Sequence, residues 1–204
     1  MQNRPRHHLA ALSSLAVTVV LSVGVRAGAG MIFNDLAATN GGAETASGTN
    51  WLTAAFTTDS TAYTTLSTTL LLQNTSAGAA ELDIYSDGGL RPGTLKSVLT
   101  SPATYSSSSL ANATFTGSGL TLSANTKYWL VLKATSGAFD WGWTNDDSIV
   151  QEWGTSSNSG SVWFTDNAFP FQYSVTGTVP EPRQAAAVAI ALMSIAFTRR
   201  TRHA

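Results

Sequence analysis

The chain has 204 residues, a formal net charge of −1, no cysteine and only three histidines. The histidines are His7, His8 and His203, so residues 30–178 contain neither histidine nor cysteine. This absence excludes cysteine nucleophiles, Ser-His-Asp triads and cysteine- or histidine-based zinc sites from that segment. It also predicts a fold that is held by packing alone, without disulfides.

The charge is unevenly distributed along the chain. Residues 30–178 carry eleven acidic side chains and only four basic ones, Arg91, Lys96, Lys127 and Lys133, which gives a net charge near −7. An acidic surface of this kind argues against nucleic acid and anionic lipid as partners.

The first 29 residues have the pattern of a signal peptide. Arg4, Arg6, His7 and His8 form a basic start, and an almost uncharged stretch rich in Leu, Val and Ala follows from Leu9 to Val25. Ala27-Gly28-Ala29 then supplies the small residues of a cleavage site. This order predicts export through the Sec translocon, cleavage by signal peptidase and a mature chain that begins near Gly30.

Residues 30–178 are expected to form one domain of β-strands. Apolar and polar residues alternate with period two in runs such as Leu66–Leu72, Leu82–Tyr85, Tyr128–Lys133 and Phe169–Val175, and turn residues such as Asp87-Gly88-Gly89 separate the runs. No stretch with helical periodicity is long enough for a major helix. Nine or ten short strands therefore predict an all-β, antiparallel β-sandwich that is jelly-roll-like.

Residues 179–204 form a tail with three ordered parts: Val179-Pro180-Glu181-Pro182, an alanine-rich apolar run over 185–197, and Arg199, Arg200 and Arg202. The prolines favour an extended chain. As a helix, the apolar run would span roughly 20 Å. A hydrocarbon core is about 30 Å thick, so this run predicts a weak transmembrane helix that serves only as a transient anchor. The arginines should remain on the cytoplasmic side.

The tail resembles the PEP-CTERM sorting signal of Gram-negative bacteria. That resemblance implies recognition by an exosortase, transient anchoring in the inner membrane and delivery to the cell surface or extracellular matrix. The sequence leaves open whether the tail is replaced by a glycolipid anchor or simply removed.

A second resemblance covers roughly residues 50–175. Its ordered pieces are Trp51-Leu52, Phe56-Thr57-Thr58, Leu70-Leu71-Leu72, Leu82–Asp87, Pro92–Leu95, Leu120–Leu132 and Phe139-Asp140-Trp141. Together they are similar to the choice-of-anchor family of bacterial surface domains, of the type labelled R. This resemblance implies an exported β-rich surface domain, and it implies no reaction and no site residues.

Trp141 and Trp143 are the first candidates for a binding site. On a strand they would face the same side, about 7 Å apart. If exposed, they could stack on the rings of a polysaccharide while Asp140 bonds its hydroxyl groups. The competing interpretation, which we favour, places both tryptophans in the core, because large aromatic side chains dominate the cores of sandwiches.

Acidic turn residues provide two further candidate sites. Asn145, Asp146 and Asp147 are hard oxygen ligands that could bind Ca²⁺, with Asp166 and Asn167 as further donors, although their spacing matches no defined calcium loop. Solvated acids are the favoured alternative, and no other cofactor is expected. A glycosidase needs two carboxylates at a fixed separation, and Asp83, Asp87, Asp140 and Glu152 are its candidates.

Three functions therefore compete. The favoured one is an exported, exosortase-sorted surface or matrix protein with a non-catalytic β-sandwich domain. The alternative is a carbohydrate-binding module that stacks exopolysaccharide on Trp141 and Trp143. The third is a glycoside-active enzyme, for which the sequence offers least support.

Overall fold

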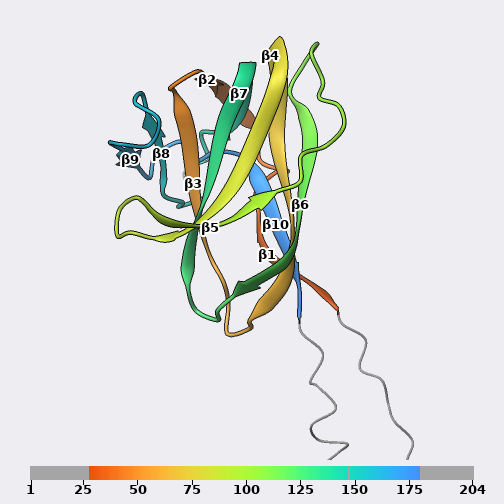
Figure 1. The fold of residues 1–204 in the computed structure, drawn as a ribbon, viewed down its shortest axis with the longest axis vertical. Helices are drawn as coiled ribbons and strands as arrows, with labels where there is room; N and C mark the ends of the chain where they lie inside the picture. The colour runs from red at the N-terminus through yellow and green to blue at the C-terminus, as the bar shows by residue number, and fades with distance from the viewer. Residues whose placement is uncertain (1–27, 147, 180–204) are drawn as a thin grey trace, which may run out of the picture. The chain divides into compact units, whose positions relative to one another are not determined.

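Ten β-strands form the part of the chain that the computed structural model describes, residues 28–146 and 148–179 (Figure 1). The predicted signal peptide (apart from Gly28 and Ala29), Asp147 and the sorting tail from Pro180 onwards lie outside the described residues. The strands are β1 (Ala29–Asn34), β2 (Asn40–Ser47), β3 (Trp51–Thr57), β4 (Tyr63–Asp87), β5 (Pro92–Leu99), β6 (Ala111–Leu122), β7 (Lys127–Thr144), β8 (Trp153–Ser156), β9 (Phe164–Asp166) and β10 (Tyr173–Thr178).

The predicted all-β, antiparallel sandwich is confirmed. No helix occurs in the described ranges, and every strand pair is antiparallel. The strand order is β1-β10-β4-β7-β3-β8-β9, with β2 beside β7 and with β5 and β6 beside β4. The finer jelly-roll-like assignment stays a prediction.

Two strands are much longer than expected and join the layers of the sandwich. The first half of β4 lies between β10 and β6, whereas its second half lies between β7 and β5. The two separate strands predicted around Leu66–Leu72 and Leu82–Tyr85 are thus one strand of 25 residues. In the same way, the runs around Tyr128–Lys133 and Phe139–Trp143 form one strand, β7, of 18 residues.

Glycines allow β4 and β7 to stay paired through this change of layer. The β4–β7 register shifts between Asn74 and Ala80. A Cβ atom on Gly78 would lie 2.1 Å from the carbonyl oxygen of Ser136, and one on Gly137 would lie 2.1 Å from that of Ser76. Gly137 also has a φ of +69°. Only glycine fits such close backbone contact. The irregular pairing interrupts the period-two pattern, which is why the sequence predicts a break between two strands at this point.

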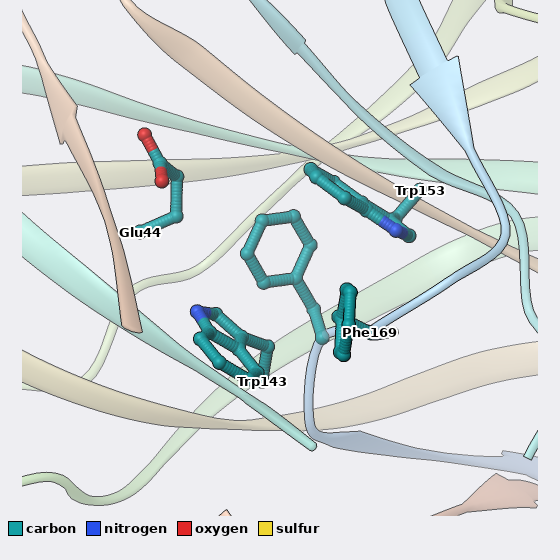
Figure 2. A pocket seen from close by; sticks show the side chains of 5 residues that line it. Glu44, Trp143, Trp153 and Phe169 are labelled. Atoms are coloured by element: carbon teal, nitrogen blue, oxygen red, sulfur yellow. The ribbon is translucent and has the colours of Figure 1, made fainter. Parts of the chain in front are cut away.

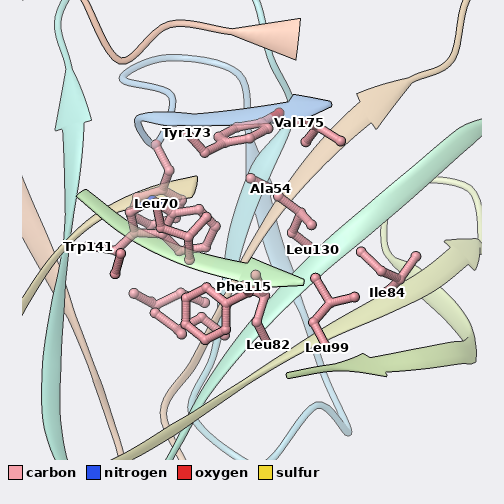
Figure 3. Close-up of a cluster of buried hydrophobic side chains, with 14 of the residues drawn as sticks. Ala54, Leu70, Leu82, Ile84, Leu99, Phe115, Leu130, Trp141, Tyr173 and Val175 are labelled. Carbon is pink, nitrogen blue, oxygen red and sulfur yellow. The ribbon is translucent and has the colours of Figure 1, made fainter. Parts of the chain in front are cut away.

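The hydrophobic core lies between the two layers (Figure 3). Alternate residues along each strand point into this core, as the period-two pattern of the sequence predicts. Leu70, Phe115 and Val175 come from the layer around β10 and β6, and they meet Leu82, Leu130 and Ala54 from the layer around β3 and β7. All six are buried.

The two ends of the strand domain lie side by side (Figure 1). Ala29 at the start of β1 is the register partner of Thr178 at the end of β10, and the amide of Val179 donates to the carbonyl oxygen of Gly28 at 3.3 Å. The two ends of the described chain, beyond which the signal peptide and the sorting tail are predicted, therefore lie at the neighbouring ends of two paired strands.

Candidate functional site

Trp141 is a core residue, as the interpretation favoured from the sequence predicts, and the alternative of a Trp141–Trp143 surface platform does not hold for this half of the pair. Its side chain is 0 % exposed. The indole stacks on Phe171 with ring centroids 4.6 Å apart, and its Nε1 donates to the carbonyl oxygen of Gln172 at 3.0 Å. A ring that is covered on its face and hydrogen-bonded at its nitrogen has no surface left for a sugar.

Trp143, by contrast, is only partly buried and lines a pocket of about 210 Å³ (Figure 2). The other lining residues are Trp153, Phe169, Phe171 and Glu44. Trp143 meets Phe169 edge to face with centroids 5.5 Å apart, and Trp153 meets Phe171 in the same way at 5.2 Å. Four aromatic rings thus form the walls, and the carboxylate of exposed Glu44 lies at the rim.

The wall on the β2 side depends on two glycines. A Cβ atom on Gly41 or Gly42 would lie 2.4 Å from the benzo ring of Trp143, so the ring lies directly against the β2 backbone. Gly42 is also the register partner of Trp143 across the β2–β7 pair. The orientation of this indole is therefore fixed by the strands and does not depend on a ligand.

The wall opposite is built by the loop that follows β9. The carboxylate of Asp166 accepts hydrogen bonds from the amides of Asn167 and Ala168, at 2.6 and 3.1 Å. The indole Nε1 of Trp153 donates to the carbonyl oxygen of Ala168. This anchored loop holds Phe169 at a φ of +57°, a conformation that is uncommon for a bulky residue, and leaves its ring 51 % exposed.

Most of this pocket has no signal in the sequence. Period-two alternation predicts that Phe169 and Phe171 start a regular strand, but β10 begins only at Tyr173, and Phe171 makes a single isolated bridge to Trp143. Pro170 was the available signal, because a proline disfavours a central strand. Glu44 lies 99 residues from Trp143 in the chain, and no local pattern joins them.

The other predicted polar residues do not belong to this pocket. Asp140 accepts a hydrogen bond from Thr45 Oγ1 at 2.6 Å, on the face of β7 opposite to Trp141. Asp146 Oδ1 accepts from the amide and the hydroxyl of Ser148, which lowers the pKa of Asp146. Asn145 is exposed, and Asp147 lies outside the described residues.

The calcium site accordingly stays a prediction. Within residues 28–146 and 148–179, no three His, Cys, Asp or Glu side chains are grouped so that they could hold a metal ion. Besides Asp146, that prediction named Asn145 and Asp147, with Asp166 and Asn167 as further donors, and Asp147 lies outside the described residues.

The four acids considered for glycoside cleavage have other partners. Asp87 and Glu152 both pair with Lys127, at 3.3 and 2.7 Å. Asp83 pairs with Lys133, and Asp140 bonds Thr45. Among these four acids, the fold brings Asp87 and Glu152 to the same lysine, and Lys127 lies between their carboxylates.

Comparison with protein-family models and with curated protein sequences gives no match for this chain. The similarities to the choice-of-anchor family and to the PEP-CTERM signal therefore stay predictions from the sequence. Residues 28–146 and 148–179 include no helix with the length and hydrophobicity needed to cross a membrane. The apolar run over 185–197, where the sequence predicts such a helix, lies outside the described residues.

Proposed function

We propose that the protein is an exported, exosortase-sorted component of the cell surface or extracellular matrix, with a non-catalytic β-sandwich domain. One observation supports this most: all ten strands of the described chain lie between Ala29 and Thr178, which pair with each other. Removal of a signal peptide and a sorting tail near these points would leave the hydrophobic core and, apart from Ala29 at the start of β1, every described strand in place.

Intact-mass measurement of the protein released from the cell surface tests this proposal. The expected product lacks residues 1–29 and ends near Val179–Pro182. Glu181→Ala and a variant without Arg199, Arg200 and Arg202 should stay in the inner-membrane fraction. Recovery of surface protein that still contains Arg202 would contradict sorting by cleavage of the tail.

The aromatic pocket supports a second candidate function, binding of a neutral polysaccharide. Aromatic rings can stack on sugar faces, and the carboxylate of Glu44 can accept hydrogen bonds from hydroxyl groups. A volume of about 210 Å³ is below the ~300–1,000 Å³ of typical small-molecule pockets, which suits one sugar ring at a time. The acidic charge of the domain favours a neutral glycan over an anionic one.

A glycan array followed by titration of tryptophan fluorescence tests this second function. Binding should be lost in Trp143→Ala and weakened in Glu44→Gln. Phe164→Ala, which removes an exposed aromatic ring that does not line the pocket, is the matched control and should bind normally. Equal binding by Trp143→Ala and the control would place any glycan site elsewhere.

A further inference from the structure

Lys133 lies between two carboxylates on the neighbouring strand. It is the register partner of Glu81 across the β4–β7 pair, and Asp83 lies two residues further along β4 on the same face. Lys133 Nζ contacts Asp83 Oδ2 directly and lies 3.0 Å from Glu81 Oε1. One amine therefore touches two acids that belong to one strand.

This cluster is largely removed from water. The side chain of Asp83 is 0 % exposed and that of Lys133 is 14 % exposed. The ammonium of Lys133 lies 4.6 Å from the centre of the Trp51 ring and 5.9 Å from that of Tyr85. Two aromatic rings thus lie near the amine in addition to the two acids.

As an ion pair, the cluster is incompletely satisfied. Asp83 Oδ1 is buried and has no hydrogen-bond partner among the described residues. A buried carboxylate with a free oxygen keeps a large desolvation penalty, even when a cation neutralises its other oxygen. Conversion of the pair into a neutral group would remove both charges from this site.

We propose that Lys133 and Asp83 form an amide crosslink between β7 and β4, with Glu81 as the catalytic group that transfers the proton. The bond would join side chains 50 residues apart in the sequence. In a domain without cysteine, such a bond would restrict the unfolded chain in the way that a disulfide does. It goes beyond the expectation that packing alone holds this fold.

The chemistry needs no oxidant, reductant or cofactor. One proton passes from the Lys133 ammonium to Asp83, which gives a neutral amine and a neutral acid. Nζ attacks Cγ of Asp83, and the new Nζ–Cγ bond forms as one Cγ–O bond breaks. Glu81 takes a second proton from Nζ and delivers it to the departing oxygen. Of the three ammonium hydrogens, one stays on the amide and two leave in a molecule of water.

The environment favours the neutral acid and the approach of the two reacting groups. Burial raises the pKa of Asp83, although its contacts with Lys133 act in the opposite direction, so the neutral acid is more accessible than in water. Neutral lysine is the nucleophilic form. Desolvation favours it, but the contacts with Asp83 and Glu81 outweigh desolvation and raise the pKa of Lys133, so the proton has to pass to Asp83 before Nζ can attack. The strands hold the amine and carboxyl group in contact, so little entropy is lost on reaction. Glu81, which is 36 % exposed, lies on the side from which water can leave.

Tryptic peptide mapping of the denatured full-length protein tests the proposal directly. An amide at Lys133 blocks cleavage after this residue and joins the peptide that contains Asp83 to the one that begins at Tyr128. We expect this branched peptide, lower in mass by one water than its two parts, in wild-type protein. Asp83→Ala and Lys133→Arg should give only linear peptides, and Lys127→Arg is the control that should keep the branch.

Quantitative cleavage after Lys133, in wild-type protein that had folded before it was denatured for digestion, would overturn the proposal, whether or not any variant folds. Glu81→Gln tests the proton-transfer role separately. We expect at least a tenfold lower rate of crosslinking in this variant, which circular dichroism should show to be folded. An unchanged rate would overturn the role of Glu81.

Discussion

Strand β7 carries two lysine clusters of similar composition and different environment. Lys127 pairs with Asp87 and Glu152, and Lys133 pairs with Glu81 and Asp83. In the first cluster the side chain of Lys127 is 26 % exposed and that of Glu152 is 36 % exposed, whereas Asp83 in the second is fully buried. The same residue types thus form one partly exposed cluster and one cluster with a buried carboxylate.

The difference in burial determines what each cluster can do. Lys127 donates to Glu152 and to the carbonyl oxygen of Gly89, and Asp87 also accepts from the indole of Trp129 at 2.9 Å. Solvent and these partners stabilise the charges, so the first cluster is an ordinary surface ion pair. In the second cluster a buried carboxyl oxygen has no partner in the described chain, and charge is costly there. Burial therefore favours covalent chemistry at Lys133 and leaves Lys127 ionic.

The largest expected effect is that of Asp83→Ala. The variant removes the partner of a buried ammonium, for which a loss of about 3–5 kcal/mol is typical, and it also removes the proposed crosslink. The free energy of unfolding in urea should fall accordingly. Glu44→Ala, which removes an exposed acid from β2, is the control and should unfold like the wild type. Equal unfolding of the two variants would contradict the special role given to the Lys133 cluster.

The two neighbouring tryptophans of β7 extend the comparison to aromatic residues. Trp141→Ala should cost about 3–5 kcal/mol, because it leaves a cavity in the core. Trp143→Ala should cost closer to the ~1 kcal/mol of an average substitution, because its ring is partly exposed. Acrylamide should quench Trp143 and leave Trp141 protected, as single-tryptophan variants can show. Similar losses of stability would mean that both rings belong to the core.

Asp35 shows what happens to a buried acid without a lysine beside it. Its Oδ1 accepts from the amide of Tyr173 at 2.6 Å, and its Oδ2 has no partner among the described residues. Burial outweighs this backbone hydrogen bond and raises the pKa of Asp35 from 3.8 to about 7. The protonated acid is therefore the form that the folded domain favours.

Because the folded pKa is raised, the stability from Asp35 is fully present below pH 3.8 and is lost as the pH rises to about 7. The upper bound of this loss is roughly 4 kcal/mol, at ~1.4 kcal/mol per pH unit. Urea unfolding at pH 4 and pH 8 measures it, with Asp35→Asn as the comparison. The difference in stability between the variant and the wild type should change in favour of the variant as the pH rises. A pH-independent difference would contradict a neutral Asp35.

The sequence predicts the strands of this domain well, but it does not predict which distant residues come together. Period-two alternation at Leu66–Leu72 and Leu82–Tyr85 predicts strands and a sandwich, because each strand has one buried face. The alternation cannot show that these runs are one strand, because the link depends on close backbone contact between Gly78 and Gly137. The alternation also places Trp141 and Trp143 on one face of the strand, but it does not show how deeply each side chain is buried. Long-range strand register places Glu44 and Asp83, and the anchored loop after β9 places Phe169. No local sequence pattern contains this information.

The smallest expected effect is that of Glu152→Gln in the exposed cluster. Lys127 keeps its contact with Asp87 and its hydrogen bond to Gly89 in this variant, and solvent replaces what Glu152 supplied. The loss should be at most about 1 kcal/mol. It should nearly vanish in 1 M salt, where the screening length falls to about 3 Å. The effect of Asp83→Ala should persist under the same conditions, since its site is shielded from ions. If salt weakened both effects equally, the two clusters would share one environment, and burial could not be the reason for their different chemistry.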